Sequence, residues 1–249
     1  MAVLLFSGAL CALVFCDGGA PAKVRPHIEA VMPHDTAAFT QGLFYDGGLL
    51  YESDGLYEKS RLRVIDAASG AVKREIPLDR RYFAEGCAKL GETLVQLSWR
   101  EQTALVWSLP ALSPGQPLMY SGEGWGLASD GRRFYMSDGS DTVFVRSADF
   151  TIERKLPVTS LGMPVKNLNE LEFVKGKLYA NVWYQDIIVE INPGSGRVSR
   201  IIDCSDMVKQ EQPNSSECVL NGIAYNPQSG CFYITGKKWK KLFVVRLPE

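Results

Sequence analysis

Apolar and polar residues alternate along most of this chain in short runs that are separated by turn residues. Between residues 39 and 78, three such runs follow one another, and each alternates as a half-buried strand requires. The same layout returns four more times, in segments that begin at Phe83, Trp125, Leu168 and Leu220. Sustained helical periodicity is missing, apart from a single turn around residues 206–210. The pattern therefore predicts an all-β fold built from repeats.

The repeats have the length of propeller blades. Equivalent places, about 40 to 50 residues apart as in such blades, are occupied by Gly42, Gly86, Gly126, Leu171 and Gly222. Glycine-containing turns at residues 46–48 and 129–131 stand where hairpins need positive φ. We predict a five-bladed β-propeller, and a sandwich of five hairpins is the alternative.

The two ends of the chain are predicted to meet in the last blade. The final repeat contains only three strand-like runs before the chain ends at Glu249, so its blade lacks an outer strand. Residues 26–32 precede the first repeat and have no blade of their own. Pairing them with the final repeat would remove an open sheet edge. The N-terminal strand is therefore expected to close the last blade.

The chain begins with an apolar run, AVLLFSGALCALVF, directly after Met1. The run is too short to span a bilayer and is followed by the small residues DGGAPA, which is typical of a signal peptide. We predict a signal peptide at residues 1–22 and one catalytic propeller domain at residues 23–249. The protein would then be secreted or lie in the lumen of the secretory pathway. No Lys or Arg precedes the run, so a retained hydrophobic tail is the alternative.

Four cysteines remain after such a leader, namely Cys87, Cys204, Cys218 and Cys231. They allow three pairings. A Cys204–Cys218 disulfide is favoured because it would close a polar loop, and this leaves Cys87 and Cys231 open. Asn214 within the loop begins an N-glycosylation triplet. Both features agree with export.

Charge excludes two classes of partner. The formal net charge is −1, and the basic residues are scattered rather than clustered, so nucleic acid is not expected as a partner. The chain also lacks the basic amphipathic helix of membrane-surface proteins, so no membrane contact is expected after signal removal. We expect a monomer.

The residues beside the repeat glycines carry the candidate chemistry. In a propeller, the ends of the innermost strands surround a central channel. The repeats place these side chains there: Phe39, Gln41, Phe83, Glu85, Trp99, Glu123, Trp125, Asn169, Glu170, Asn181, Trp183, Asn221 and Lys237. Singly, each has a structural explanation, such as a core tryptophan or a turn-capping glutamate. Their gathering at one face predicts a binding or active site.

Several strings within these repeats resemble those of the glutaminyl cyclases of plants and bacteria. They are HDTAAFTQGL, YESDGLY, EGWGLASDG, NLNELEF, ANVW, LNGIAYN and ITGKKW, and together they cover nearly everything from His34 to Leu247. The resemblance implies a five-bladed propeller that converts N-terminal glutamine of peptides and proteins to pyroglutamate and releases ammonia. It also implies a transferase of the aminoacyltransferase class.

The resemblance also implies site residues. The family's acidic residue matches Glu85, and its catalytic amides and lysine match Gln41, Asn169 and Lys237. The substrate-binding positions match Phe39, Phe83, Trp99, Trp125 and Trp183. We add Asn221 as a substrate-binding residue because it directly precedes the repeat glycine Gly222. Two positions depart from the family pattern, since Ala84 replaces a glycine and Cys87 replaces an aliphatic residue. Both are small changes at non-reacting positions, so they put the detail of the pocket in doubt rather than the activity.

These residue types suit the implied chemistry. The α-amine must lose a proton to attack its own side-chain carboxamide, and the departing nitrogen must gain one. A carboxylate such as Glu85, with a pKa raised by aromatic surroundings, can carry that proton. Gln41, Asn169 and Lys237 would stabilise the oxyanion or hold the carboxamide for attack, and the roles of the individual groups stay open.

Histidine is too scarce for the usual competing mechanisms. Only His27 and His34 are present, and both precede the first repeat, so a His-ligated catalytic zinc or a Ser-His-Asp triad is hard to assemble. We expect no metal ligands at the site and no cofactor for catalysis, and leave open a structural divalent cation in the channel. Two rival functions remain: a non-catalytic propeller that binds peptides or glycans through its aromatic face, and a metal-dependent, lactonase-like hydrolase.

Overall fold

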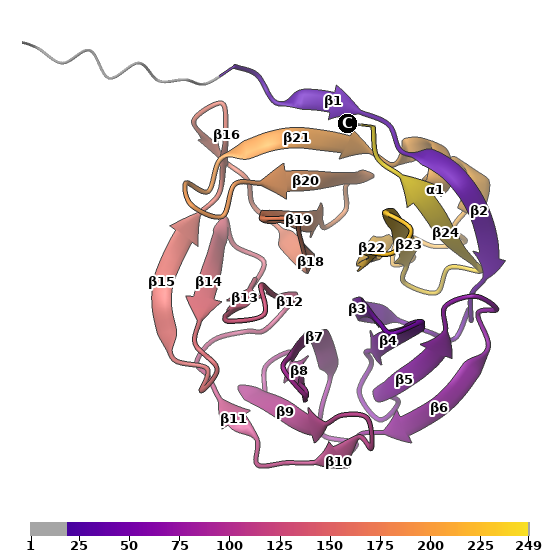
Figure 1. Cartoon of the computed structure of the whole chain (residues 1–249), viewed down its shortest axis with the longest axis vertical. Coiled ribbons are helices and arrows are strands. Elements are labelled where there is room, and N and C mark those ends of the chain that lie inside the picture. Colours follow the sequence, from indigo (N-terminus) through magenta and orange to yellow (C-terminus); the bar gives the residue numbers. More distant parts are fainter. Residues whose placement is uncertain (1–18, 249) are drawn as a thin grey trace, which may run out of the picture.

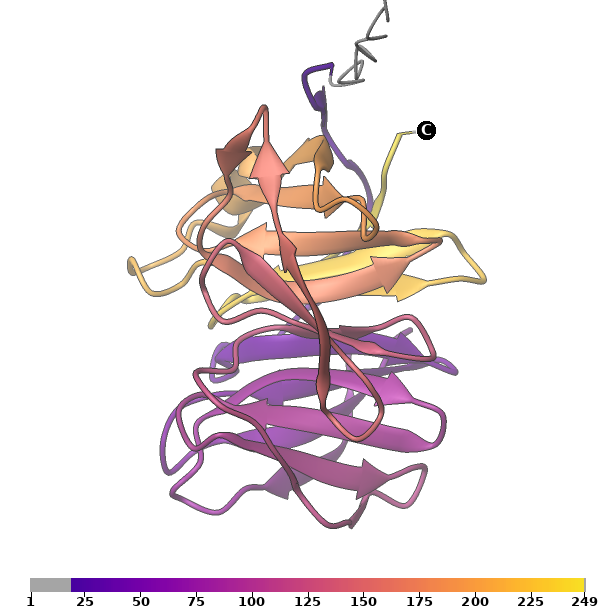
Figure 2. The same ribbon diagram turned by 90° about the vertical axis from the view of Figure 1, so that its left-hand side faces the viewer.

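The computed structural model describes residues 19–248 and shows five blades arranged around a central axis (Figure 1). The predicted β-propeller is therefore confirmed. Figure 2 shows the same ring from its side. The predicted leader at residues 1–22 lies almost entirely outside the described residues. Within residues 19–248, no helix is long and apolar enough to cross a membrane.

The first three blades follow one another along the chain. Blade 1 consists of β3 (Thr40–Asp46), β4 (Leu49–Asp54), β5 (Arg61–Asp66) and β6 (Val72–Pro77). Blade 2 consists of β7 (Ala84–Leu90), β8 (Thr93–Ser98) and β9 (Thr103–Ser108), with β10 (Ser113–Pro114) and β11 (Leu118–Met119) both paired to β9. Blade 3 consists of β12 (Leu127–Ser129), β13 (Phe134–Met136), β14 (Thr142–Arg146) and β15 (Ile152–Pro157).

The last two blades carry the additional elements. Blade 4 consists of β18 (Leu168–Val174), β19 (Lys177–Val182), β20 (Ile187–Ile191) and β21 (Val198–Asp203). Blade 5 consists of β22 (Leu220–Asn226), β23 (Cys231–Gly236) and β24 (Lys241–Arg246). A hairpin of β16 (Thr159–Ser160) and β17 (Met163–Pro164) joins blades 3 and 4. The helix α1 (Ser205–Glu211) joins blades 4 and 5, where the sequence predicts a single turn.

The N-terminal strand closes the ring, as predicted. β2 (His27–Pro33) pairs antiparallel with β24, so that His27 lies opposite Arg246 and Pro33 opposite Lys241. The preceding strand β1 (Ala22–Val24) adds to blade 4 by pairing parallel with β21, which the repeat pattern does not predict. The first and last strands of the described residues are thus paired within the blades, which leaves no open gap in the ring.

Four of the innermost strands contain a bulge near their start, and the bulges correct one sequence assignment. In blades 1, 2, 4 and 5 the register shifts between Thr40 and Gly42, Ala84 and Cys87, Leu168 and Leu171, and Leu220 and Ile223. A Cβ atom on Gly126 would lie 2.8 Å from the Cα atom of Glu170. Glu170, and not Leu171, is therefore the blade 4 equivalent of the repeat glycines.

Glu170 carries a side chain at this crowded position because its carboxylate reaches other blades. One oxygen accepts a hydrogen bond from the backbone N–H of Leu43 in blade 1 at 3.2 Å, and the other accepts one from Ile223 in blade 5 at 2.8 Å. The side chain is fully buried, and burial raises the pKa of Glu170 well above its usual range. The residue thus links three blades around the channel.

The hydrophobic core lies between neighbouring blades. Val143 and Val145 of blade 3 pack against Leu171 and Leu178 of blade 4, and all four side chains are buried. Similar clusters fill the other blade contacts. Since every second residue of the middle strands faces such a contact, the alternation in the sequence reflects blade-to-blade packing.

The favoured Cys204–Cys218 disulfide is absent, because Cys87, Cys204, Cys218 and Cys231 are all free and buried. The Cys218 sulfur lies 3.2 Å from both the Ser215 hydroxyl and the Asn214 side-chain oxygen. The Cys204 sulfur instead faces the Ile202 carbonyl. Each sulfur thus has a polar neighbour within its own segment. The disulfide predicted from the spacing of Cys204 and Cys218 is therefore wrong.

Candidate active site

One cavity brings together most of the residues that the sequence singles out. It has a volume of about 220 Å³ and is lined by Phe39, Gln41, Glu85, Trp99, Trp125, Asn169, Trp183, Glu217 and Lys237. Eight of the ten predicted site residues are in this set. The other two, Phe83 and Asn221, contact it from behind.

The inner-strand bulges aim the polar side chains into the cavity. Gln41, Glu85, Asn169 and Asn221 all lie within the bulges at the starts of β3, β7, β18 and β22. The blades approach very closely here, since a Cβ atom on Gly86 would lie 2.4 Å from the backbone nitrogen of Leu127. The repeat glycines therefore allow side chains from different blades to meet near the axis.

Glu85 is a buried carboxyl group at the base of this cavity. Its exposed fraction is 5%, and its Oε1 accepts a hydrogen bond from the Gln41 amide nitrogen at 2.9 Å. Burial raises the pKa of Glu85 well above its usual range, and the negative charges of Glu123 and Glu101 add to this, while the Lys237 cation acts against it. A carboxyl group whose pKa is raised in this way is suited to take up and return a proton.

The side-chain amide of Gln41 is fixed beside Glu85 by Asn221, while within residues 19–248 that of Asn169 keeps a free oxygen. The Asn221 amide nitrogen donates to the Gln41 side-chain oxygen at 3.2 Å and to the Thr40 carbonyl at 2.9 Å. This orients the Gln41 amide so that its nitrogen faces Glu85. The Asn169 side-chain oxygen, by contrast, is buried without a hydrogen-bond partner among the described residues. Because such an orphan acceptor is costly, it is suited to an N–H group of a ligand in the cavity.

Lys237 is the cationic side chain of the cavity wall. It follows β23, has an exposed fraction of 5%, and its Nζ lies 4.8 Å from the Phe39 ring centroid and 5.7 Å from that of Trp183. Burial lowers the pKa of Lys237, and the negative charges of Glu85 and Glu217 partly restore it. Its ammonium group is therefore held by aromatic faces rather than by a direct ion pair, which keeps it available to a developing negative charge.

Aromatic rings form the remaining walls. Trp125 meets Trp183 edge-on, with ring centroids 5.2 Å apart. Phe83 lies behind the wall, where its ring packs at 5.5 Å from Trp99 and 6.2 Å from Phe39. Phe83 thus packs behind two lining residues, and its role in substrate binding stays a prediction.

Glu217 lines the cavity but was missed by sequence reasoning. It lies in the loop after α1, outside the repeat pattern, and its carboxylate accepts a hydrogen bond from the Tyr184 hydroxyl at 3.0 Å. The Tyr184 ring stacks on Trp183 with centroids 4.3 Å apart. The sequence does show that Tyr184 directly follows the wall residue Trp183. It does not show that the Tyr184 hydroxyl bonds Glu217, so it could not place Glu217 at the cavity.

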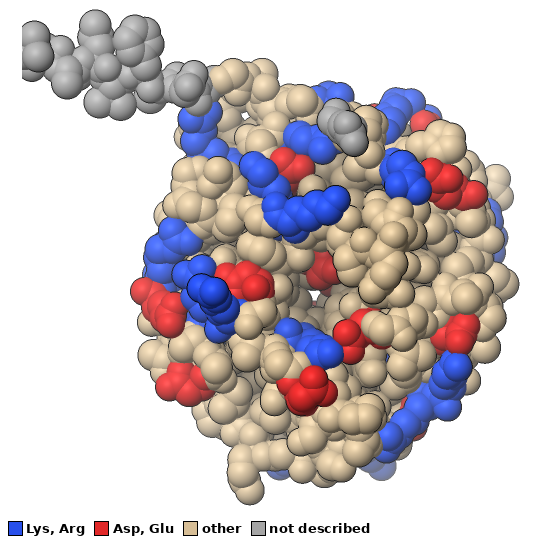
Figure 3. Space-filling view, in the orientation of Figure 1, with Lys and Arg blue, Asp and Glu red and all other residues tan. Residues whose placement is uncertain are grey.

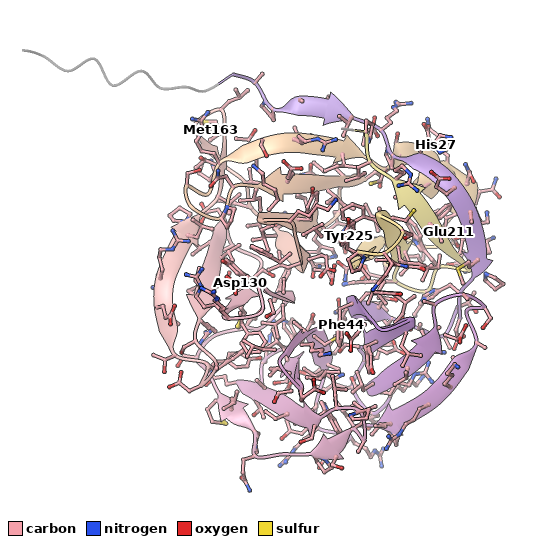
Figure 4. All side chains as sticks on the ribbon, in the orientation of Figure 1. His27, Phe44, Asp130, Met163, Glu211 and Tyr225 are labelled. Carbon is pink, nitrogen blue, oxygen red and sulfur yellow. The ribbon has the colours of Figure 1, made fainter. Side chains whose placement is uncertain are left out.

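A second cavity, of about 590 Å³, lies at the opposite ends of the inner strands. Its lining includes Phe44, Lys89, Glu172 and Tyr225 and none of the predicted site residues. Phe44 and Tyr225 are labelled near the axis in Figure 4. In the view of Figure 3, charged residues of both signs are scattered around a central hollow.

Among the described residues, no group of three His, Cys, Asp or Glu side chains could hold a metal ion.

Known proteins are similar to this chain in sequence and in fold. The glutamine cyclotransferase family matches residues 3–247. A glutaminyl-peptide cyclotransferase of Arabidopsis thaliana is 37% identical over 227 residues, which cover 89% of this chain and 71% of that protein. The crystal structure of Myxococcus xanthus glutaminyl cyclase superposes with a TM-score of 0.86 at 38% identity, covering 91% of this chain and 98% of that one.

Proposed function

Because the chain belongs to the glutamine cyclotransferase family, we propose that it cyclises the N-terminal glutamine of peptides and proteins, with Glu85 as the proton carrier. The products are an N-terminal pyroglutamate and ammonia. The observation that carries the assignment to Glu85 is its position: it is a buried carboxyl group with a raised pKa, at the base of an aromatic cavity, beside one amide and one ammonium group.

The reaction needs one proton to move between two nitrogens. The neutral α-amine nitrogen of the substrate forms a bond to the side-chain carbonyl carbon, and the carbonyl oxygen gains negative charge. As this bond forms, the nitrogen gives a proton to the Glu85 carboxylate, whose raised pKa makes it a stronger base than an ordinary glutamate. Glu85 returns the proton to the carboxamide nitrogen, the carbon–nitrogen bond breaks, and ammonia leaves. Glu85 ends in its starting state, so no net proton is consumed.

Lys237 and Asn169 act on the two ends of the carboxamide. Lys237 is the ammonium group of the cavity and stabilises the oxyanion. The unpartnered Asn169 oxygen accepts a hydrogen bond from the substrate's nitrogen and orients it. Gln41, which already donates to Glu85, keeps that carboxyl group pointed at the substrate.

The size of the cavity suits a single residue. At about 220 Å³ it is smaller than the roughly 300–1,000 Å³ of pockets that enclose drug-sized ligands. The N-terminal glutamine alone would enter, while the rest of the peptide stays outside. Selectivity therefore comes from the first residue.

Incubation with a Gln-initiated peptide tests the function directly. Loss of the mass of one ammonia is expected by mass spectrometry, and a matched peptide that begins with asparagine should stay unchanged. We propose that no cofactor takes part, so a chelator should leave the rate unaltered. Product that disappears with chelator would support a metal-dependent mechanism, and binding without any product would support the non-catalytic propeller.

Export and a monomeric state are further proposals. The apolar run at the start of the sequence supports a signal peptide, and Asn214 lies on an exposed loop, where a glycan can attach. Since the disulfide is absent, export rests on these two features. N-terminal sequencing of the mature protein, glycosidase treatment and light scattering would test cleavage near residues 20–22, the glycan and the oligomeric state.

A further inference from the structure

A single carboxylate, Glu123, holds two walls of the cavity together. Its Oε2 atom accepts hydrogen bonds from the indole nitrogens of both Trp99 and Trp125, at 2.8 and 3.1 Å. Its Oε1 atom accepts a hydrogen bond from the Arg100 Nε atom at 2.9 Å. Glu123 itself is not part of the cavity lining. It is therefore placed to act through the tryptophans rather than on the substrate.

The two indoles come from different blades, so Glu123 sets the distance between them. Trp99 follows β8 of blade 2, and Trp125 precedes β12 of blade 3. An indole has only one polar atom, and all its other contacts are apolar. The Trp99 ring contacts Phe83 at a tilt of 59° and the Arg100 guanidinium, whose carbon is 3.6 Å from the ring centroid. Neither contact involves the indole N–H group, whereas the hydrogen bond to Glu123 fixes the direction of that group.

The packing around Trp125 does not fix the direction of its indole N–H group. A Cβ atom on Gly139 would lie 2.6 Å from this ring, so the indole rests against bare backbone on that side. Trp183 meets it edge-on. Neither contact involves the indole N–H group. Among the described residues, only the carboxylate of Glu123 accepts a hydrogen bond from it.

We propose that Glu123 is a positioning residue that fixes the spacing of Trp99 and Trp125 for the N-terminal glutamine. The proposal rests on the function assigned above. The single oxygen that serves both indoles ties their rotations together, so a glutamine side chain meets a slot of constant width. Loss of this oxygen frees both rings and weakens substrate binding more than the chemical step.

The charge of Glu123 provides a second readout at Glu85. Facing Glu85 are the cation of Lys237 and the amide of Gln41, together with Glu101 and Glu123 as negative charges. The hydroxyls of Tyr57 and Tyr120 are also close enough to interact with Glu85. Removing the Glu123 charge makes Glu85 easier to deprotonate. Its basic form then persists to lower pH, and the acidic limb of the kcat/KM profile shifts to lower pH.

Two substitutions separate hydrogen bonding from charge. Glu123→Gln keeps a side-chain oxygen that can accept from both indoles but removes the charge, while Glu123→Leu removes both. We expect E123L to lose about 10- to 100-fold in kcat/KM, mainly through KM, since misplaced binding groups have effects of this order. E123Q should recover most of that loss, and both variants should shift the acidic limb to lower pH. Glu153→Gln, which removes an exposed carboxylate of β15, is the control and should match the wild type.

Equal KM values for E123Q and E123L, or wild-type KM values for both, would overturn the proposal. If E123L fails to fold, Glu123→Ala replaces it and is compared with Trp99→Phe and Trp125→Phe, which remove one indole N–H each. In either Phe background E123A should raise KM less than it does in the wild type, and an equal rise would contradict a role through the indoles. Tryptophan emission of the ligand-free variants is read in parallel. It reports on wall geometry even if no cyclisation is found, so failure of the function and failure of this proposal stay distinct.

Discussion

Replacing Glu52 by glutamine removes the charge at the centre of a buried network that joins blade 1 to the segment after β23. One oxygen of Glu52 accepts hydrogen bonds from His34 Nε2 at 2.8 Å and from the Thr40 hydroxyl at 2.7 Å. The other accepts one from Arg63 at 3.3 Å. His34 also bonds the Trp239 carbonyl at 2.7 Å, so the network links blade 1 to the segment after Lys237.

The magnitude follows from the pKa of Glu52. Burial alone would raise this pKa, but His34 and Arg63 lower it from 4.5 to about 2. A difference of this size corresponds to about 3 kcal/mol of folding free energy at neutral pH, at about 1.4 kcal/mol per unit. Breaking one partner of a buried ion pair has a similar effect, about 3–5 kcal/mol. The pKa of Asp54 is raised to about 6 by burial and by the charge of Glu52. Removing the Glu52 charge makes Asp54 easier to ionise, which offsets part of the loss in folding free energy.

Urea unfolding of E52Q and wild type at pH 7 measures the difference. We expect a loss of about 3 kcal/mol, or a drop in Tm of roughly 6–12 °C for a chain of this size. Because the pKa of Glu52 is lowered on folding, the stabilisation is present above pH 4.5 and disappears as the pH falls towards 2. The wild type should therefore lose its advantage over E52Q in that window.

His34 adds the opposite dependence on pH. Its pKa is raised, since Glu52 and the Trp239 carbonyl outweigh the effect of burial, so its contribution is present below pH 6.5 and fades as the pH rises through the higher folded value. The control is Glu58→Gln, which removes an exposed carboxylate from the loop between β4 and β5 of the same blade and should change stability by less than about 1 kcal/mol. An E52Q loss as small as that of the control would refute the reasoning.

The remaining predictions concern the cavity. Lys237→Met should lower kcat by about 10²- to 10³-fold with little change in KM, as expected for a group that stabilises charge only in the transition state, and steady-state kinetics on a Gln-peptide would check this. If Glu85 and Lys237 act in the same step, E85Q and the E85Q/K237M double variant should lose the same factor in kcat. Asn169→Ala should lower kcat/KM by about 2- to 10-fold, the value of one neutral hydrogen bond; no change would remove Asn169 from the site.

Much of the fold was predictable because propeller packing leaves a periodic record. Alternation along each strand reflects burial between blades, and the missing outer strand of the last repeat indicated that β2 would close the ring. The parallel pairing of β1 with β21 was not predictable, since β1 is three residues long and carries no alternation. The sequence pattern placed the blade 4 equivalent of the repeat glycines at Leu171, one residue too late. Blade 4 has no glycine at this position and uses Glu170 instead, whose carboxylate reaches two other blades.

The site was predictable where its residues belong to the repeat. Glu85, Gln41 and Asn169 occupy matching bulges, so one alignment places all three at the same face. Glu217 escaped because it comes from the insert around α1, whose path depends on tertiary contacts such as the Tyr184 hydrogen bond. The disulfide was mispredicted for a related reason, since sequence spacing does not show which way two buried sulfurs face.

The kcat of Glu85→Gln on a Gln-initiated peptide tests the central claim most directly. The substitution keeps the size of the side chain and an oxygen that can accept from Gln41, and it replaces a carboxyl group with a raised pKa, so the thermal stability should stay close to that of the wild type. We expect kcat to fall by about 10²- to 10⁴-fold, the usual contribution of a proton-transfer group. A folded E85Q variant whose kcat stays within tenfold of the wild type would contradict Glu85 as the proton carrier.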